Sequence, residues 1–255
     1  MTFSSISFIC VFFPVVFVLH WFLPGIQAKN VCLILASLLF YAYGEPVYVL
    51  LMIVSAFVNY LLGLILDRRR SRLWLWVAVF WNMGILAVFK YAGFVVSLLH
   101  QMGLSMIPVP AITLPIGISF FTFQIMSYVI DVYRGTVEAQ KNYGKILLYI
   151  AFFPQLIAGP IVKYHDVERS INSRTLSVDR AAFGMRRFVA GLSKKVLLAN
   201  TFALAADTIF AADAARINIC SAWIGAFSYL LQIYFDFSGY SDMALGMAEM
   251  FGFRF

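Results

Sequence analysis

Charged residues, histidines and cysteines are all scarce in this chain. Only 12% of its 255 residues are Asp, Glu, Lys or Arg, whereas soluble proteins have about 25%. The three cysteines have no paired spacing and no histidine cluster beside them, so they predict neither a disulfide framework nor a metal site. The sequence also lacks a nucleophile elbow and a phosphate-binding loop. We therefore expect neither a soluble domain nor a bound metal or cofactor.

The chain consists largely of long hydrophobic stretches. Hydrophobic residues make up 62% of it, and the mean hydropathy is +0.87. Uncharged runs cover Thr2–Ala28, Asn30–Gly44, Pro46–Leu66, Leu73–Phe89, Gln101–Ile130, Ile146–Val162 and Ile217–Phe235. Several exceed the roughly 17–25 residues that a helix needs to cross a bilayer. The first run is longer than the apolar core of a signal peptide and no Lys or Arg precedes it, so we expect it to remain as a spanning helix. The sequence predicts an all-α, multi-pass integral membrane protein.

The net charge of +7 follows from where the basic residues lie between these runs. They gather at Arg68–Arg72 and Lys163–Lys195, whereas the stretch His100–Pro110 has no Lys or Arg. Because cytoplasmic loops are enriched in Lys and Arg, we expect these two clusters inside, and His100–Pro110 and the amino terminus outside. This distribution explains the charge without a nucleic-acid partner. No repeat or linker divides the chain, so we expect one membrane domain over residues 1–255.

The long basic stretch should form a cytoplasmic segment of short helices, about 163–195. Ser177 or Asp179 is a candidate cap for a helix that begins near Arg180. Lys194 and Lys195 should then anchor a separate helix that runs outward to about Ala212.

The run Ile146–Val162 departs from the pattern, because basic residues flank it at both ends and helix breakers interrupt it. Such a segment is typical of a re-entrant structure that lines a cavity, although an ordinary Pro-kinked helix would have the same sequence. The candidate cavity residues here are Pro154, Gln155, Gly159 and Pro160.

A second polar feature lies in the run that begins at Ile217. Gln232, Asp236 and Tyr240 are spaced four residues apart, so a helix would place them on one face. Polar groups are costly in lipid, and they predict a face toward a protein interior or a tunnel rather than toward lipid. The candidate tunnel-lining residues are Gln232, Asp236, Ser238, Tyr240, Ser241 and Asp242. The alternative is an interhelical hydrogen-bond clamp without a functional role.

None of the three histidines is a strong catalytic candidate. His20 and His100 are expected near membrane interfaces as packed or solvated residues. His165 stands next to Asp166, but neighbouring residues on a helix do not face each other, so the pair is not evidence of a catalytic dyad.

Several blocks resemble the membrane-bound O-acyltransferase family, and within it the alginate O-acetyltransferase type. They are Phe3-Ser4-Ser5, Ala36–Pro46, Asn59–Gly63, Phe89-Lys90-Tyr91, Leu114–Phe120, Pro154-Gln155 with Ala158–Ile161, and Tyr234–Ala244. The blocks run from end to end of the chain in the family's order.

This resemblance implies a ring of helices around a tunnel in the inner membrane. An acyl group, typically acetyl, would reach a hydroxyl of an extracytoplasmic polysaccharide such as alginate, with acetyl-CoA as a candidate donor. It also implies a periplasmic or cell-surface acyltransferase partner, besides the membrane lipid.

The family's catalytic histidine follows the Asp236–Asp242 block, beyond Phe255. We therefore expect the chain to be an amino-terminal portion that is inactive alone. The competing hypothesis is a non-catalytic transporter or scaffold with the same polar cavity.

Overall fold

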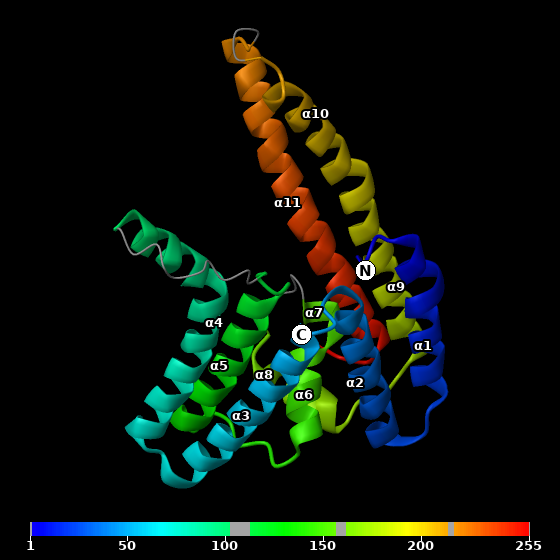
Figure 1. The fold of residues 1–255 in the computed structure, drawn as a ribbon. Coiled ribbons are helices and arrows are strands. Elements are labelled where there is room, and N and C mark those ends of the chain that lie inside the picture. Colours follow the sequence, from blue (N-terminus) through cyan, green and yellow to red (C-terminus); the bar gives the residue numbers. More distant parts are fainter. Residues whose placement is uncertain (1, 103–112, 157–161, 214–216, 255) are drawn as a thin grey trace. The chain divides into compact units, whose positions relative to one another are not determined.

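Every regular element that the structure describes is a helix. The computed structural model describes residues 2–102, 113–156, 162–213 and 217–254. Its elements, shown in Figure 1, are η1 (Phe8–Phe12), α1 (Phe13–Phe22), α2 (Gly25–Gly44), α3 (Tyr48–Arg69), α4 (Arg72–Gln101), α5 (Ile118–Arg134), α6 (Tyr143–Ala151), α7 (Phe153–Leu156), α8 (Tyr164–Asn172), α9 (Val178–Ser193), η2 (Lys194–Ala199), α10 (Asn200–Phe210) and α11 (Ile219–Met250). The elements labelled η are π-helical turns. The all-α prediction is confirmed.

Contacts within the chain group the described residues into two compact units. The first unit combines residues 2–24 with 173–254, and the second contains residues 25–156 and 162–172. The expectation of one membrane domain is not tested by this grouping and stays a prediction.

The first hydrophobic run, Thr2–Ala28, does not form the single spanning helix that was expected. α1 ends at Phe22, Leu23 is extended, and α2 begins at Gly25. Pro24 explains the break, because a proline disfavours helical backbone in the residue before it. Gly25 then adopts a φ of +70°, which glycine takes at little cost. Lys29 therefore lies inside α2.

The second unit is held together partly by a buried amide pair. Asn59 of α3 and Asn82 of α4 are fully buried and exchange two hydrogen bonds, of 3.0 and 2.7 Å. Asn59 also donates to the Ser55 carbonyl, and Asn82 donates to the Ala78 carbonyl, each one turn earlier on its own helix. Hydrogen bonds between polar side chains help to hold membrane helices together, because lipid is as apolar as the helices and the hydrophobic effect does not drive their association.

The segment around Pro154 is an interrupted helix rather than a smoothly kinked one. α6 has nine residues, so it is about 14 Å long, against a hydrocarbon core of about 30 Å. It ends at Ala151. The next residue, Phe152, has a ψ of 106°, which is not helical, and the four-residue α7 starts at Phe153.

Side chains satisfy the backbone at this interruption. An unbroken helix would pair the Phe153 N–H with the Tyr149 carbonyl. Instead, the Phe153 N–H donates to Ser37 Oγ at 3.1 Å, and the Tyr149 carbonyl accepts from the Nε2 atoms of Gln124 and Gln155, at 2.9 and 2.6 Å. Irregular backbone in a membrane protein requires such compensation.

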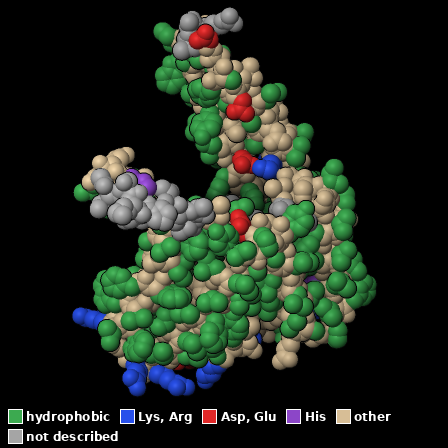
Figure 2. All heavy atoms as spheres, viewed as in Figure 1, with side chains coloured by type: hydrophobic (Ala, Val, Ile, Leu, Met, Phe, Trp, Pro, Cys, Tyr) green, Lys and Arg blue, Asp and Glu red, His purple; other side chains and the backbone are tan. Residues whose placement is uncertain are grey.

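Among the described helices, four are long and apolar enough to cross a membrane: α2, α3, α4 and the continuous helix Val178–Phe210. α11 is not one of the four, and Phe8–Phe22 is shorter. In the second unit, Figure 2 shows hydrophobic side chains over most of the visible face and Lys and Arg at the end where α3 meets α4. Arg68, Arg69, Arg70 and Arg72 are all exposed there.

The first unit contains the largest departure from the sequence prediction. α9, η2 and α10 form one continuous helix of 33 residues, so no new helix begins at Lys194. Ser177 caps its start by accepting a hydrogen bond from the Arg180 N–H at 3.3 Å, as one of the two cap candidates predicted. Lys194 and Lys195 lie in the middle of this helix. Positive charges there need partners, and the neighbouring α11 supplies them.

Candidate functional site

The candidate site is on the antiparallel pair formed by α9–η2 and α11, where the two backbones touch. A Cβ atom added to Gly191 would lie 2.5 Å from the Gly239 carbonyl oxygen, and one added to Gly246 would lie 2.5 Å from the Gly184 carbonyl oxygen. Each helix thus presents two glycines seven residues apart, which is about two turns. Any larger residue would force the helices apart, so the glycines fix which side chains oppose each other.

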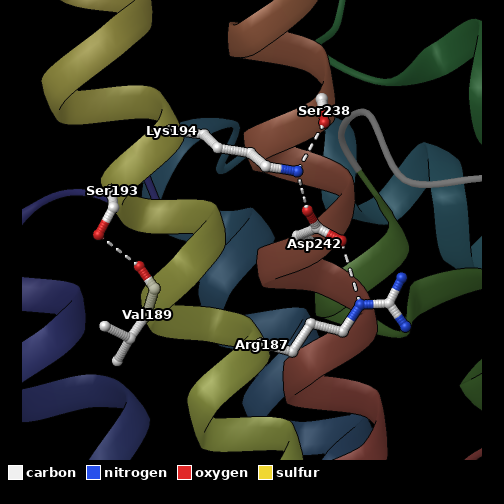
Figure 3. A network of polar contacts seen from close by, with 6 residues as sticks. All are labelled: Arg187, Val189, Ser193, Lys194, Ser238 and Asp242. Atoms are coloured by element: carbon white, nitrogen blue, oxygen red, sulfur yellow. Dashed lines mark hydrogen bonds and ion pairs between the residues drawn. The ribbon is translucent and has the colours of Figure 1, made fainter.

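Next to the Gly191–Gly239 contact, Asp242 binds two cations from the facing helix (Figure 3). Its Oδ2 accepts from Lys194 Nζ at 2.6 Å, and its Oδ1 accepts from Arg187 Nε at 3.1 Å. Lys194 Nζ also donates to Ser238 Oγ at 3.1 Å. The Asp242 side chain is 21% exposed. We call Arg187, Lys194, Ser238 and Asp242 the helix clamp, because they tie η2 and α9 to α11.

The second carboxylate on this helix has a different environment. Asp236 Oδ1 accepts a hydrogen bond from Lys195 Nζ, and the Asp236 side chain is 53% exposed. The pair borders a cavity of about 230 Å³ that is also lined by Gln232, Ile233, Phe237 and Tyr240. The buried Oε1 atom of Gln232 has no hydrogen-bond partner among the described residues. The cavity therefore combines a self-neutralised ion pair with an amide acceptor and apolar walls.

The predicted tunnel residues thus separate into two sets. Gln232, Asp236 and Tyr240 line the cavity, and the Tyr240 ring also stacks on Phe3 with centroids 4.7 Å apart. Ser238 and Asp242 belong to the helix clamp, and Ser241 is half-buried on the same helix.

Of the other predicted cavity residues, two belong to the second unit. Pro154 and Gln155 are buried in α7. Gly159 and Pro160 lie outside the described residues. A tunnel role for either set stays a prediction.

Sequence reasoning missed the cations, because Lys194 and Lys195 were placed at a helix start facing the cytoplasm. Both lysines lie at the start of a π-helical turn, and both contact α11. The Asn200 N–H donates to the Lys195 carbonyl five residues earlier, so this turn holds one residue more than an α-helical turn. A usable signal was available: the apolar Val196-Leu197-Leu198 follows the lysines directly, which favours a helix that continues through them.

His20 is fully buried and belongs to the packing of the first unit. Its Nε2 lies 3.1 Å from Arg174 Nη2, and its ring meets Phe251 edge-on with centroids 5.1 Å apart. The Arg174 guanidinium lies 4.7 Å from the centre of the Phe253 ring. Burial lowers the pKa of Arg174 to about 10, so it stays charged at neutral pH.

His165 is exposed, and its Nδ1 atom is 3.1 Å from Asp166 Oδ1. The expectation that these neighbours do not meet was wrong, because two exposed side chains at a helix start can rotate toward each other. The side chains of His165 and Asp166 are 64% and 43% exposed, so the contact lies at a solvated surface rather than in a pocket. Within the described ranges, no three His, Cys, Asp or Glu residues group as a metal site.

Four apolar helices of membrane-crossing length define an integral membrane protein, and ion pairs connect two of its helices, α9–η2 and α11. The model of MBOAT, the membrane-bound O-acyltransferase family, matches residues 88–255. The chain belongs to this family, as the resemblance of its sequence blocks implied.

Individual relatives extend the match over the whole chain. A probable alginate O-acetylase of Pseudomonas aeruginosa is 41% identical over 264 residues, which cover 100% of this chain and 50% of the relative. A peptidoglycan O-acetyltransferase of Helicobacter pylori is 33% identical over 288 residues, covering 99% of this chain and 54% of the relative. A teichoic acid D-alanyltransferase of Bacillus subtilis is 24% identical over 145 residues, covering 54% of this chain and 36% of the relative. The chain spans about half the length of the first two.

Proposed function

We propose that this chain forms part of a membrane O-acyltransferase that moves an acetyl group toward hydroxyls of an extracytoplasmic polysaccharide. Family membership carries this proposal, because the matched region, residues 88–255, includes the paired charges and the cavity on α11. Lys195 borders the cavity and lies within Val178–Phe210, a helix of membrane-crossing length, and an ionisable residue inside such a helix is a functional-site hypothesis by default.

The relatives favour acetyl over other acyl groups and a polysaccharide as the final acceptor. Relatives named for O-acetylation of alginate and of peptidoglycan match essentially the whole chain, at 41% and 33% identity. The relative named for D-alanyl transfer matches about half of it, at 24%.

In this proposal, the cavity orients a reacting group and another residue removes the proton. A general base must lie within about 2.6–3.2 Å of the hydroxyl that it deprotonates. None of the three histidines, His20, His100 and His165, is among the residues that line the cavity. We therefore assign the base to the family's histidine, which the resemblance places beyond Phe255, and expect this chain alone to be inactive.

The proposal includes acetyl-CoA as donor, a location in the inner membrane, and a periplasmic or cell-surface acyltransferase that completes the transfer. Apolar helices commit the chain to the membrane, and a separate transferase outside the bilayer would receive the acetyl group and pass it to the polymer.

The test is to delete the gene that encodes this chain and to measure the ester-linked acetate that alkali releases from the secreted or wall polysaccharide. We expect the deletion to remove this acetate and the intact gene to restore it. A strain carrying only codons 1–255 should insert the protein without restoring acetate. Polysaccharide acetylation that is unchanged by the deletion would contradict the proposal, and acetate restored by the short chain would contradict the assignment of the base.

A further inference from the structure

We propose that Lys195 is a positioning residue for acyl transfer: it holds the Asp236 carboxylate at the cavity. The inference rests on the proposed function and gives the two carboxylates of α11 different roles. Asp236 serves the cavity, whereas Asp242 serves the packing of the helices.

The contacts of the two carboxylates distinguish these roles. Asp242 has a cation on each oxygen, at 2.6 and 3.1 Å, and its side chain is 21% exposed. Among the described residues, Asp236 has one cationic partner, Lys195, and the Asp236 side chain is 53% exposed. A carboxylate that is bound on both oxygens has little capacity left for a ligand, whereas one bound on a single oxygen can still accept hydrogen bonds.

The position of Asp236 supports a role in binding rather than in stability. It borders the cavity together with Gln232, whose buried Oε1 atom has no partner in the part of the chain that is described. An exposed ion pair contributes only about 0–1 kcal/mol to stability, so Lys195 is not needed to hold the helices together. The two glycine contacts and the helix clamp already do so.

The two adjacent lysines contact two different acids on α11. In a regular α-helix, neighbouring residues point about 100° apart. The π-helical turn that begins at Lys194 contains an extra residue, and both ammonium groups contact α11, Lys194 at Asp242 and Lys195 at Asp236. π-Helical turns within longer helices occur frequently at functional sites.

The experiment uses the complete gene product that carries this chain, and it measures acetate transferred per membrane-inserted copy together with Tm. Lys195→Met should lower transfer per copy by about 10- to 100-fold, because misplacing a positioned group by 1 Å can cost 10²-fold. Its Tm should stay close to that of the unaltered protein. The matched control is Arg187→Met, which removes one cation from the helix clamp and should lower Tm while the remaining copies keep their transfer rate.

A charge exchange separates positioning from simple charge balance. Lys195→Asp combined with Asp236→Lys restores an ion pair but moves the carboxylate to the other helix, so stability should persist while transfer stays low. Recovery of transfer in this exchange would overturn the inference, as would Lys195→Met with normal transfer per copy. If the unaltered protein transfers no acetate, the proposed function itself fails, and this result is distinct from either of the others.

Discussion

Replacing Gly191 with alanine tests whether the backbones of α9 and α11 are in contact as described. The added Cβ atom would lie 2.5 Å from the Gly239 carbonyl oxygen and 2.7 Å from the Met243 backbone nitrogen. Both are main-chain atoms, so no side-chain rotation can relieve the overlap and the helices must separate. Overpacking of this kind costs about 1–3 kcal/mol, and we expect a value near the upper end.

The control is the same substitution at a glycine with space around it. Gly84 lies in α4, and a Cβ atom added there would meet nothing within 4 Å. Because alanine is a better helix former, Gly84→Ala should stabilise the helix by about 0.5–1 kcal/mol. Thermal unfolding of the purified protein in detergent should therefore shift Tm down for Gly191→Ala and up or not at all for Gly84→Ala. If both variants unfold at the same temperature, the described contact between the two helices is wrong.

Three further predictions concern the amide pair, the helix cap and the topology. Asn59→Leu should leave a donor and an acceptor of the buried Asn82 amide unpaired, at a cost of about 1–3 kcal/mol, and adding Asn82→Leu should recover much of the lost Tm. Ser177→Ala removes the cap of α9 and should cost about 1 kcal/mol; hydrogen exchange should rise at Arg180 but not at the interior of the helix. In a cysteine-free background, an impermeant thiol reagent applied to intact cells should label Ser105→Cys but not Ser71→Cys, and the reverse pattern would refute the predicted orientation.

The sequence was sufficient to place the helices whose boundaries depend on nearby residues. The run Pro46–Leu66 corresponds to α3, and Leu73 onward corresponds to α4. α5 is bracketed by Gly117 and Gly135, both in left-handed backbone, with φ of 77° and 75°. These positions could be predicted because hydrophobic length and helix-breaking residues act within a few residues of chain.

The elements that the sequence misplaced depend on partners far along the chain. The rule that places lysines at the cytoplasmic interface does not take account of Asp236 and Asp242, which lie more than 40 residues later in the sequence. It therefore predicted that a new helix begins at Lys194. The four-residue spacing of Gln232, Asp236 and Tyr240 identified the face that lines the cavity. The spacing could not separate Asp236 from Asp242, because their roles depend on cations from another helix.

The central claim, that the cavity on α11 serves acyl transfer, is tested most directly by Asp236→Asn. This change keeps the shape of the side chain and removes its charge, so the membrane level of the complete gene product should persist. We predict that polysaccharide-linked acetate per copy of the protein falls at least tenfold. Normal acetate per copy, or a loss of acetate that only follows a loss of protein, would contradict the claim.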